Sequence, residues 1–232
     1  MDNVLIGNTF STYDEVLEKG THILIAGTQG SGKSTLINGL IHSLCYRDPS
    51  PDLYLIDPKR VDLRKFRNMR LVKKRVTEGC EAAALLTDII NTMENRYKEM
   101  ENKDIDLYDG KDIFVIIDEI ADLIDTNGKE IIPLLKRIAQ LGRAAKIHLI
   151  VATQILLAEI IKTAISGNFD TKIALRTVTA NQSRVILGIN GAESLPRYGY
   201  GIIYNADGIK RYALPPIPKE ELDKAIEFWN RC

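Results

Sequence analysis

The sequence predicts an α/β protein with a mainly parallel central sheet flanked by helices and a β-hairpin near its carboxyl end. Three observations indicate this fold class. A glycine-rich loop at residues 27–34 lies between an apolar run of strand length and a segment of helical periodicity. A second apolar run, at residues 113–117, ends in two carboxylates. Strand-like and helix-like segments alternate along the chain, which is typical of βαβ units.

The first elements follow from local patterns. Residues 1–20 form a lead-in, with an edge strand expected at residues 3–10 and a short helix at 12–19. Residues 22–26 form the first core strand, and apolar spacing from Ser34 onward predicts a helix. A second buried strand is expected at residues 52–58, where Pro58 stops it.

Residues 60–76 form a basic stretch for which the sequence predicts no regular element. Solvated surface is its default interpretation, and a contact with another subunit or with phosphate remains open. Its cations are Arg60, Arg64, Lys65, Arg67, Arg70, Lys73, Lys74 and Arg75.

The remaining elements complete one domain. The core is expected at residues 21–215, and residues 216–232 contain a terminal helix that packs on the same domain. The further elements are helices at residues 78–100, 130–145, 182–187 and 220–231, strands at 113–119, 147–153 and 171–177, and a hairpin at 201–214 that turns at Ala206-Asp207-Gly208.

Composition excludes several classes of protein. The 232 residues contain 31 basic and 31 acidic side chains, so the chain has no net basic field that would indicate nucleic-acid binding. Any such contact must be local. The three cysteines lack the spacing of a disulfide framework or a zinc site. The absence of a long apolar segment and of an amino-terminal targeting signal predicts a cytoplasmic protein, unless a partner carries it to a membrane.

The glycine-rich loop matches a phosphate-binding pattern of Gly, four residues, Gly, Lys and Ser. Glycines let backbone N–H groups turn toward a polyphosphate, and the following helix adds positive partial charge. Lys33 is expected to reach the β- and γ-phosphates, and the Ser34 hydroxyl to bind Mg²⁺. A glycine-rich turn that matches by chance is the alternative. The predicted nucleotide-binding residues are Gly27, Thr28, Gln29, Gly30, Ser31, Gly32, Lys33, Ser34 and Thr35.

The carboxylate pair after residues 113–117 is the second motif. Asp118 is expected to hold the Mg²⁺ shell, and Glu119 to point to the other side of the pleat, toward an attacking water. Gln154 ends the strand at residues 147–153, where its amide can hydrogen-bond a γ-phosphate or the water. A simple polar residue at a strand end is the alternative for Gln154.

Several motifs together resemble the motor domain of the FtsK/SpoIIIE DNA translocases, within the HerA-FtsK group of RecA-like ATPases. The resemblance runs in family order from about Ile6 to Leu214. Its motifs are residues 22–34, Ile56-Asp57-Pro58-Lys59, residues 115–123, Ala139-Gln140 with Arg143-Ala144-Ala145, Ile147-His148-Leu149, Ala152-Thr153-Gln154, Ser183-Arg184 and residues 191–195.

The resemblance implies a RecA-like P-loop core that forms a hexameric ring around double-stranded DNA and uses ATP and Mg²⁺ to move it. Glu119, Lys33, Gln154 and Arg143 are then the catalytic residues. Arg143 matches the arginine that reaches across to a neighbour's γ-phosphate. An arginine favoured by the negative end of a helix is the alternative for Arg143.

The chain also departs from the family pattern. Ile155 and Leu156 stand where members commonly carry Arg-Pro, and Ala180 stands where a lysine usually precedes Ser-Arg. Arg184 is retained, and Arg176 is a second candidate for DNA contact, with Lys172, Asn181 and Arg197 as further options. The sequence contains neither the preceding subdomain nor the membrane and winged-helix parts of cell-division members. A minimal motor from a mobile element or phage is therefore expected.

The leading hypothesis is an ATP-hydrolysing DNA translocase subunit, with a partner protein that supplies the second tier or an anchor. A secretion or conjugation coupling ATPase that acts on protein partners is the alternative, favoured by the missing loop cations. A nucleotide-dependent switch without turnover is a third possibility, against which the complete set of carboxylates argues.

Overall fold

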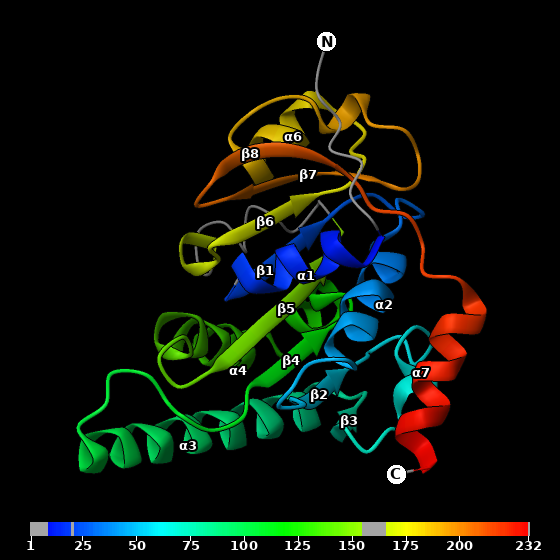
Figure 1. Cartoon of the computed structure of the whole chain (residues 1–232). Coiled ribbons are helices and arrows are strands. Elements are labelled where there is room, and N and C mark those ends of the chain that lie inside the picture. The colour runs from blue at the N-terminus through cyan, green and yellow to red at the C-terminus, as the bar shows by residue number, and fades with distance from the viewer. Residues whose placement is uncertain (1–8, 20, 155–165, 232) are drawn as a thin grey trace.

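A computed structural model describes residues 9–19, 21–154 and 166–231 (Figure 1). These residues form one eight-stranded sheet in the order β3-β2-β4-β5-β1-β6-β7-β8. Every neighbouring pair from β3 to β6 is parallel, while β7 pairs antiparallel with both β6 and β8. The predicted fold class is confirmed, including the hairpin that closes one edge.

The elements have the following bounds. The strands are β1 (His22–Ala26), β2 (Asp52–Ile56), β3 (Val72–Val76), β4 (Ile113–Ile117), β5 (Ile147–Thr153), β6 (Thr171–Ala174), β7 (Tyr200–Asn205) and β8 (Gly208–Ala213). The helices are α1 (Thr9–Lys19), α2 (Lys33–Leu44), α3 (Gly79–Lys103), α4 (Ile120–Leu141), α6 (Ala180–Leu187) and α7 (Lys219–Arg231), with short 3₁₀ turns at Arg64–Phe66, Ser166–Asn168 and Ala192–Ser194.

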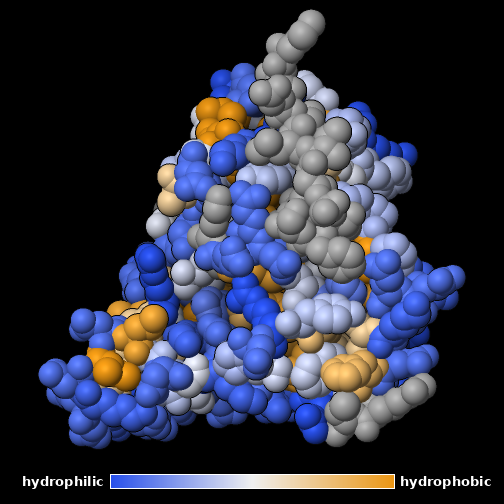
Figure 2. Space-filling model, in the orientation of Figure 1, coloured by the Kyte–Doolittle hydropathy of each residue, from blue (hydrophilic) through white to orange (hydrophobic). Residues whose placement is uncertain are grey.

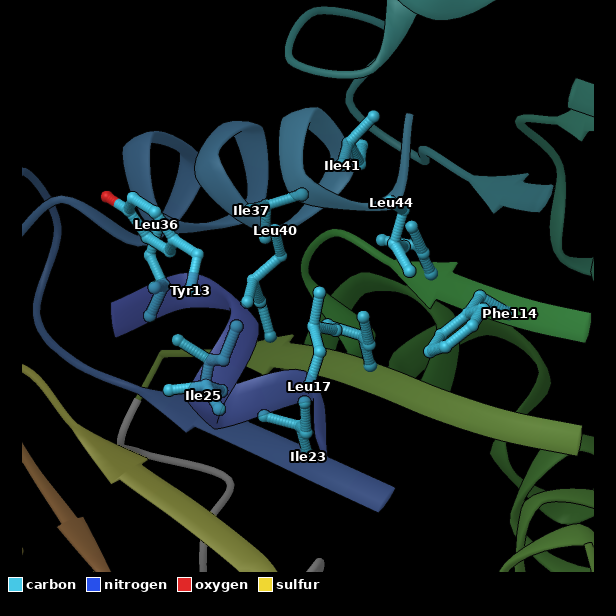
Figure 3. Close-up of a cluster of buried hydrophobic side chains, with 14 of the residues drawn as sticks. Tyr13, Leu17, Ile23, Ile25, Leu36, Ile37, Leu40, Ile41, Leu44 and Phe114 are labelled. Carbon is cyan, nitrogen blue, oxygen red and sulfur yellow. The ribbon is translucent and has the colours of Figure 1, made fainter. Parts of the chain in front are cut away.

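Side-chain alternation along β1 separates the two faces of the sheet. Ile23 and Ile25 join the core that α1, α2 and α7 cover, whereas Leu24 joins the core beneath α3 and α4. Figure 3 shows Tyr13 and Leu17 of α1 between α2 and β1. The central strands β1, β4 and β5 are buried almost throughout on both sides, as is typical of parallel sheets.

The strand order fixes where a ligand can bind. The carboxyl ends of β1, β4 and β5 lie side by side, because the three strands are neighbours and parallel. The chain crosses to opposite faces after β1 and β4, through α2 and α4 respectively. Such an edge of an open α/β sheet is where ligands bind.

The basic stretch is folded into the domain, which differs from its default interpretation as solvated surface. Leu63, Phe66, Met69 and Leu71 are almost fully buried in the core beneath α2. The end of the stretch is β3, an edge strand paired with β2. Most of its cations are exposed and lie between these buried apolar residues. The many charged residues obscured the regular apolar spacing in the sequence.

Two boundaries also differ from the sequence prediction. Helix α4 begins at Ile120, ten residues before the expected start, and carries a non-helical bend at Asn127. Buried Ile120 and Leu123 explain the early start, because they pack beneath the helix against the sheet. The expected edge strand at residues 3–10 lies mostly outside the described residues, and its last two residues are helical in α1.

The terminal helix α7 packs on the same core as α1 and α2. Leu222 and Ala225 are buried there, and Trp229 Nε1 donates to the carbonyl of Cys45 at 3.1 Å. The Trp229 carbonyl accepts a hydrogen bond from Arg70 N, so α7 is joined to both α2 and the loop before β3. Figure 2 shows that the face in view is largely hydrophilic, with apolar residues in separate spots.

Candidate nucleotide site

The glycine-rich loop joins the carboxyl end of β1 to the start of α2. Gly30 has φ +71° and Gly32 has φ +101°, values that glycine adopts without the strain a side chain would bring. Gly32 is also the residue before the first helical turn, and its carbonyl accepts from Leu36 N. Local geometry of this kind aims backbone N–H groups and a helix N-terminus into one space.

Neighbouring strands hold the loop in place. Gly27 N donates to the carbonyl of Thr153 at the end of β5, and Thr28 N donates to the carbonyl of Arg176 just beyond β6. The Thr28 hydroxyl donates to the same Arg176 carbonyl at 3.1 Å. The loop therefore rests on both strands that flank β1.

Lys33 folds back over this loop. Its Nζ donates to the carbonyls of Gly27 at 2.9 Å and Thr28 at 3.2 Å. Burial lowers the pKa of Lys33, although the carboxylates of Glu119 and Asp118 oppose that shift. The hydroxyl of Ser31 is buried within the loop and has no partner among the described residues.

A cavity of about 350 Å³ opens in front of the loop. It brings together residues from the ends of β1, β2, β4 and β5, with Tyr198 from the segment before β7. Its lining consists of Gln29, Gly30, Gly32, Lys33, Ser34, Thr35, Lys59, Asp62, Asp118, Glu119, Gln154 and Tyr198. Three of the predicted catalytic residues thus share a cavity with most of the predicted phosphate loop.

Asp118 directly follows β4 and is 4% exposed. Its backbone N–H donates to the carbonyl of Ile56, which ties it to the end of β2. Burial raises the pKa of Asp118 to about 7, and the charge of Asp62 and a hydrogen bond with its carboxyl add to the effect. A divalent cation would reverse this, because its charge favours the ionised carboxylate.

Glu119 does not continue the strand pleat, which corrects the expectation that it points to the other side. Its φ of 68° and ψ of 78° place it in a left-handed turn that starts α4. The side chain therefore stays in the cavity with Asp118. Its Oε1 accepts from Gln154 N at 3.0 Å, and its Oε2 lies 3.4 Å from Lys59 Nζ. A left-handed non-glycine residue is strained, and such strain is concentrated at functional sites.

Residues after β2 also enter the site, although the sequence assigned them no role. Asp57 is fully buried and accepts from Arg75 at 2.7 Å and from Leu63 N at 3.3 Å. These bonds shape the loop that presents Lys59 to Glu119 and Asp62 to Asp118. The rule that carboxyl ends of parallel strands meet would have found them, because Asp57 follows β2 as Asp118 follows β4.

The three predicted arginines lie outside this cavity. Arg143 is exposed in the turn between α4 and β5, next to the amino end of the sheet, and its charge acts on the pKa of His22. Arg176 is exposed beyond β6, beside the phosphate loop. Arg184 is exposed on α6. Ile155 and Leu156 fall outside the described residues.

An ATP–Mg²⁺ group fits these residues. Lys33 Nζ, which donates to the carbonyls of Gly27 and Thr28, supplies a cation for the phosphates. The Ser34 hydroxyl and the Asp118 carboxylate line the same cavity and are the oxygen ligands that Mg²⁺ prefers. The helix that begins at Lys33 carries no acidic residue in its first turn, so nothing there repels a phosphate.

Solved structures share this fold. The pCW3 conjugation coupling protein TcpA, in its monomer form with ATPγS, has a TM-score of 0.80 at 23% identity, over 91% of this chain and 66% of that one. The cytoplasmic domain of the type VII secretion ATPase EccC from Thermomonospora curvata has a TM-score of 0.74 at 24% identity, over 90% of this chain and 28% of that one. These likenesses show that this chain shares its fold with both proteins.

Sequence comparison identifies the family. The FtsK/SpoIIIE family model matches residues 3–112 and 106–157. The DNA translocase FtsK of Helicobacter pylori is 37% identical over 243 residues, which cover 97% of this chain and 28% of that protein. The FtsK of Chlorobaculum tepidum is 37% identical over 235 residues, which cover 89% and 29%. This chain thus spans less than a third of these relatives, and it belongs to the FtsK/SpoIIIE family.

Proposed function

We propose that this protein is an ATP-hydrolysing subunit of a double-stranded DNA translocase. One observation carries the proposal: the cavity joins a phosphate loop, Lys33, Ser34, Asp118 and Glu119, the groups that ATP hydrolysis requires. Family membership supports the coupling to DNA, because its relatives are named DNA translocases.

In this proposal the chain's own residues divide the work. The backbone of residues 27–35 and Lys33 hold the phosphates, while Ser34 and Asp118 hold Mg²⁺, which when bound neutralises charge on the phosphate oxygens. Glu119 accepts a proton from the attacking water, held in place by the Gln154 N–H and Lys59. The Gln154 side chain, in the same cavity, hydrogen-bonds the γ-phosphate or that water.

Arg143 acts on a neighbouring copy of the chain. It lies near the amino end of the sheet, so it cannot reach the phosphate loop at the carboxyl end of its own sheet. Its exposure leaves it available to a second subunit. A head-to-tail arrangement of copies, closed into a hexameric ring, would bring Arg143 to the next site.

DNA contact is assigned to Arg176 and Arg184, both exposed. Arg176 is coupled directly to the nucleotide site, because its carbonyl holds Thr28 in the phosphate loop. A backbone shift of Arg176 on DNA binding would therefore displace Thr28 in the phosphate loop. A chain with no net charge must rely on such local cations for phosphate contacts.

A coupling ATPase that acts on protein partners is the second candidate. It is favoured by Ala180, which begins α6 where the resemblance calls for a lysine. Among the described residues no helix combines the length and the apolarity needed to cross a bilayer. We propose a cytoplasmic protein that reaches a membrane through a partner in either case.

The test measures ATP hydrolysis with and without linear duplex DNA over a series of low salt concentrations. A DNA translocase predicts stimulation that weakens as salt rises, since phosphate contacts release counterions. Double substitution of Arg176 and Arg184 with alanine should remove the stimulation and keep the DNA-free rate. ATP hydrolysis that DNA never changes would instead favour the protein-coupling ATPase.

A further inference from the structure

Tyr198 lines the nucleotide cavity but has no role in the proposed binding of phosphate or Mg²⁺. It comes from the segment between Leu195 and Tyr200, far along the chain from the loop. Its side chain is 61% exposed, so a face of the ring is accessible. An aromatic ring that is exposed at the rim of a polar cavity offers a flat apolar surface to a ligand.

Arg197, the residue before Tyr198, lies close to the phosphate loop. A Cβ atom built on Gly30 would lie 3.8 Å from Arg197 Nη2, so the guanidinium is next to the phosphate loop. The Arg197 Cζ atom is also 5.4 Å from the centre of the Tyr198 ring. The pair thus adds a cation and an aromatic ring to the rim of the loop.

The segment that carries the pair is tied to the loop by a shared core. Ala26, the last residue of β1, packs in one buried cluster with Leu195 and Ala192. Thr177 N donates to the Ala192 carbonyl, and Leu214 N donates to the Gly199 carbonyl at 2.7 Å. Gly199 has φ +75°, which allows the chain to turn sharply from Tyr198 into β7. Packing and hydrogen bonds therefore hold the segment that carries the Tyr198 ring beside the phosphate loop.

We propose that Tyr198 and Arg197 form the subsite for the nucleobase of a bound nucleoside triphosphate, which rests on the function proposed above. Tyr198 stacks on the base, and Arg197 steadies the ring and adds positive charge beside the loop. The same cavity is lined by Asp62, Asp118 and Glu119, which are anionic and suit a metal rather than a base. Thr35, next to Ser34, also lines this cavity.

The arrangement also reassigns Arg197. The sequence offered it as a DNA contact, but its guanidinium lies at the phosphate loop. Base stacking on tyrosine tolerates different bases, because each base has a π face. The subsite thus contributes affinity for nucleosides without selecting one base.

The experiment separates the base from the phosphates. Calorimetry compares the binding of Mg²⁺–ATPγS with that of Mg²⁺–tripolyphosphate, which lacks base and ribose. Tyr198→Ala should weaken ATPγS binding between about 5-fold and 100-fold and leave tripolyphosphate binding within about 2-fold. Tyr198→Phe keeps the ring and should bind ATPγS like the wild type.

Tyr204→Ala is the matched control. Tyr204 is a half-exposed tyrosine on β7 that also carries a cation over its ring, Lys172 Nζ at 5.7 Å. Its register places it opposite Lys172, two residues from the Ala174 end of β6 that adjoins the phosphate loop. This variant should bind both ligands like the wild type.

The outcomes distinguish the inference from the function it rests on. Unchanged ATPγS binding by Tyr198→Ala, or equal weakening of both ligands, would overturn the nucleobase subsite while the ATPase stands. A Tyr198→Ala variant that keeps its ATPγS affinity and loses only self-association would also overturn it, and would assign the ring to a subunit contact. Wild-type protein that binds neither ligand would overturn the proposed function and the subsite together.

Discussion

The two ends of the central sheet hold different sets of polar groups. At the amino end, the Asp170 carboxylate accepts from Thr21 N and His22 N, and His148 Nε2 lies 2.7 Å from Asp112 Oδ1. At the carboxyl end, Asp57, Asp118 and Glu119 are all buried in one region. Asp170 and Asp112 at the amino end have hydrogen-bond partners, whereas at the carboxyl end burial and the neighbouring carboxylates Asp62, Asp57 and Glu119 raise the pKa of Asp118.

The difference teaches which end is structural and which is built for a ligand. At the amino end, Arg96 donates to the carbonyls of Ala145 and Lys146 where the chain enters β5. At the carboxyl end, Lys33, Asp118 and Glu119 line an open cavity. A charged ligand and its cation would meet these groups there.

The largest expected effect is on kcat, because the proposed site combines the amino end of one subunit with the carboxyl end of the next. Arg143→Ala should lower kcat by about 10³-fold or more, as removal of a trans-acting arginine does. Glu119→Gln should lower kcat by about 10²- to 10⁴-fold and retain ATPγS binding, because the base is lost and the phosphate contacts remain. Steady-state ATPase rates and calorimetry measure both effects.

Mixing the two inactive variants tests whether the site is shared. A head-to-tail assembly of random composition pairs an intact Glu119 with an intact Arg143 at about a quarter of its sites, and activity should return to about that level. Mixed assemblies that stay inactive would show that each site is complete within one chain.

The second prediction concerns the buried ion pair behind the carboxyl end. Arg75→Met leaves the fully buried Asp57 without its cation and should lower the free energy of unfolding by about 3 kcal/mol. The matched control is Arg137→Met, which breaks an exposed pair with Glu94 and should cost at most about 1 kcal/mol. Urea unfolding monitored by circular dichroism measures both. Equal losses would mean that the buried Asp57 carboxylate does not depend on the Arg75 cation.

The third prediction uses the raised pKa of Asp118 in protein treated with a chelator. Because this pKa is about 7 against an ordinary 3.8, the folded chain holds more protons than the unfolded chain between these values. The free energy of unfolding should therefore fall by about 2 kcal/mol as pH rises from about 5 to about 8. Asp118→Asn should flatten this slope in urea titrations. A wild-type slope that persists in the variant would assign the proton to another group.

The smallest expected effect has the opposite sign and belongs to the amino end. Burial lowers the pKa of His22 from 6.5 to about 4, so the unfolded chain binds the extra proton between those values. The contribution of His22 to the free energy of unfolding is complete above pH 6.5 and should fall by about 1–2 kcal/mol as the pH drops to about 5. His22→Asn keeps an acceptor for Leu149 N and should remove this part of the acid loss. An unchanged loss of stability in acid would assign the proton to another group.

The sequence by itself determined the elements whose chemistry is local. The phosphate loop needs glycines with positive φ at fixed spacing, and Asp118 follows an apolar strand, so both could be found from a short window of residues. Buried strands such as β4 and β5 are continuous apolar runs, which also makes them recognisable. The family motifs then placed these elements in order.

The tertiary structure alone decided what depends on distant segments. The strand order brings Lys59, Asp62 and Tyr198 to a loop that lies roughly 30 to 170 residues away in the chain. Lys59 stood in a family motif without a role, and nothing in the local sequence of Asp62 or Tyr198 indicates this site. The left-handed turn at Glu119 overrode strand alternation, because the chain had to enter α4 there. The basic run became a core segment through four buried apolar residues, since packing rather than charge decides burial.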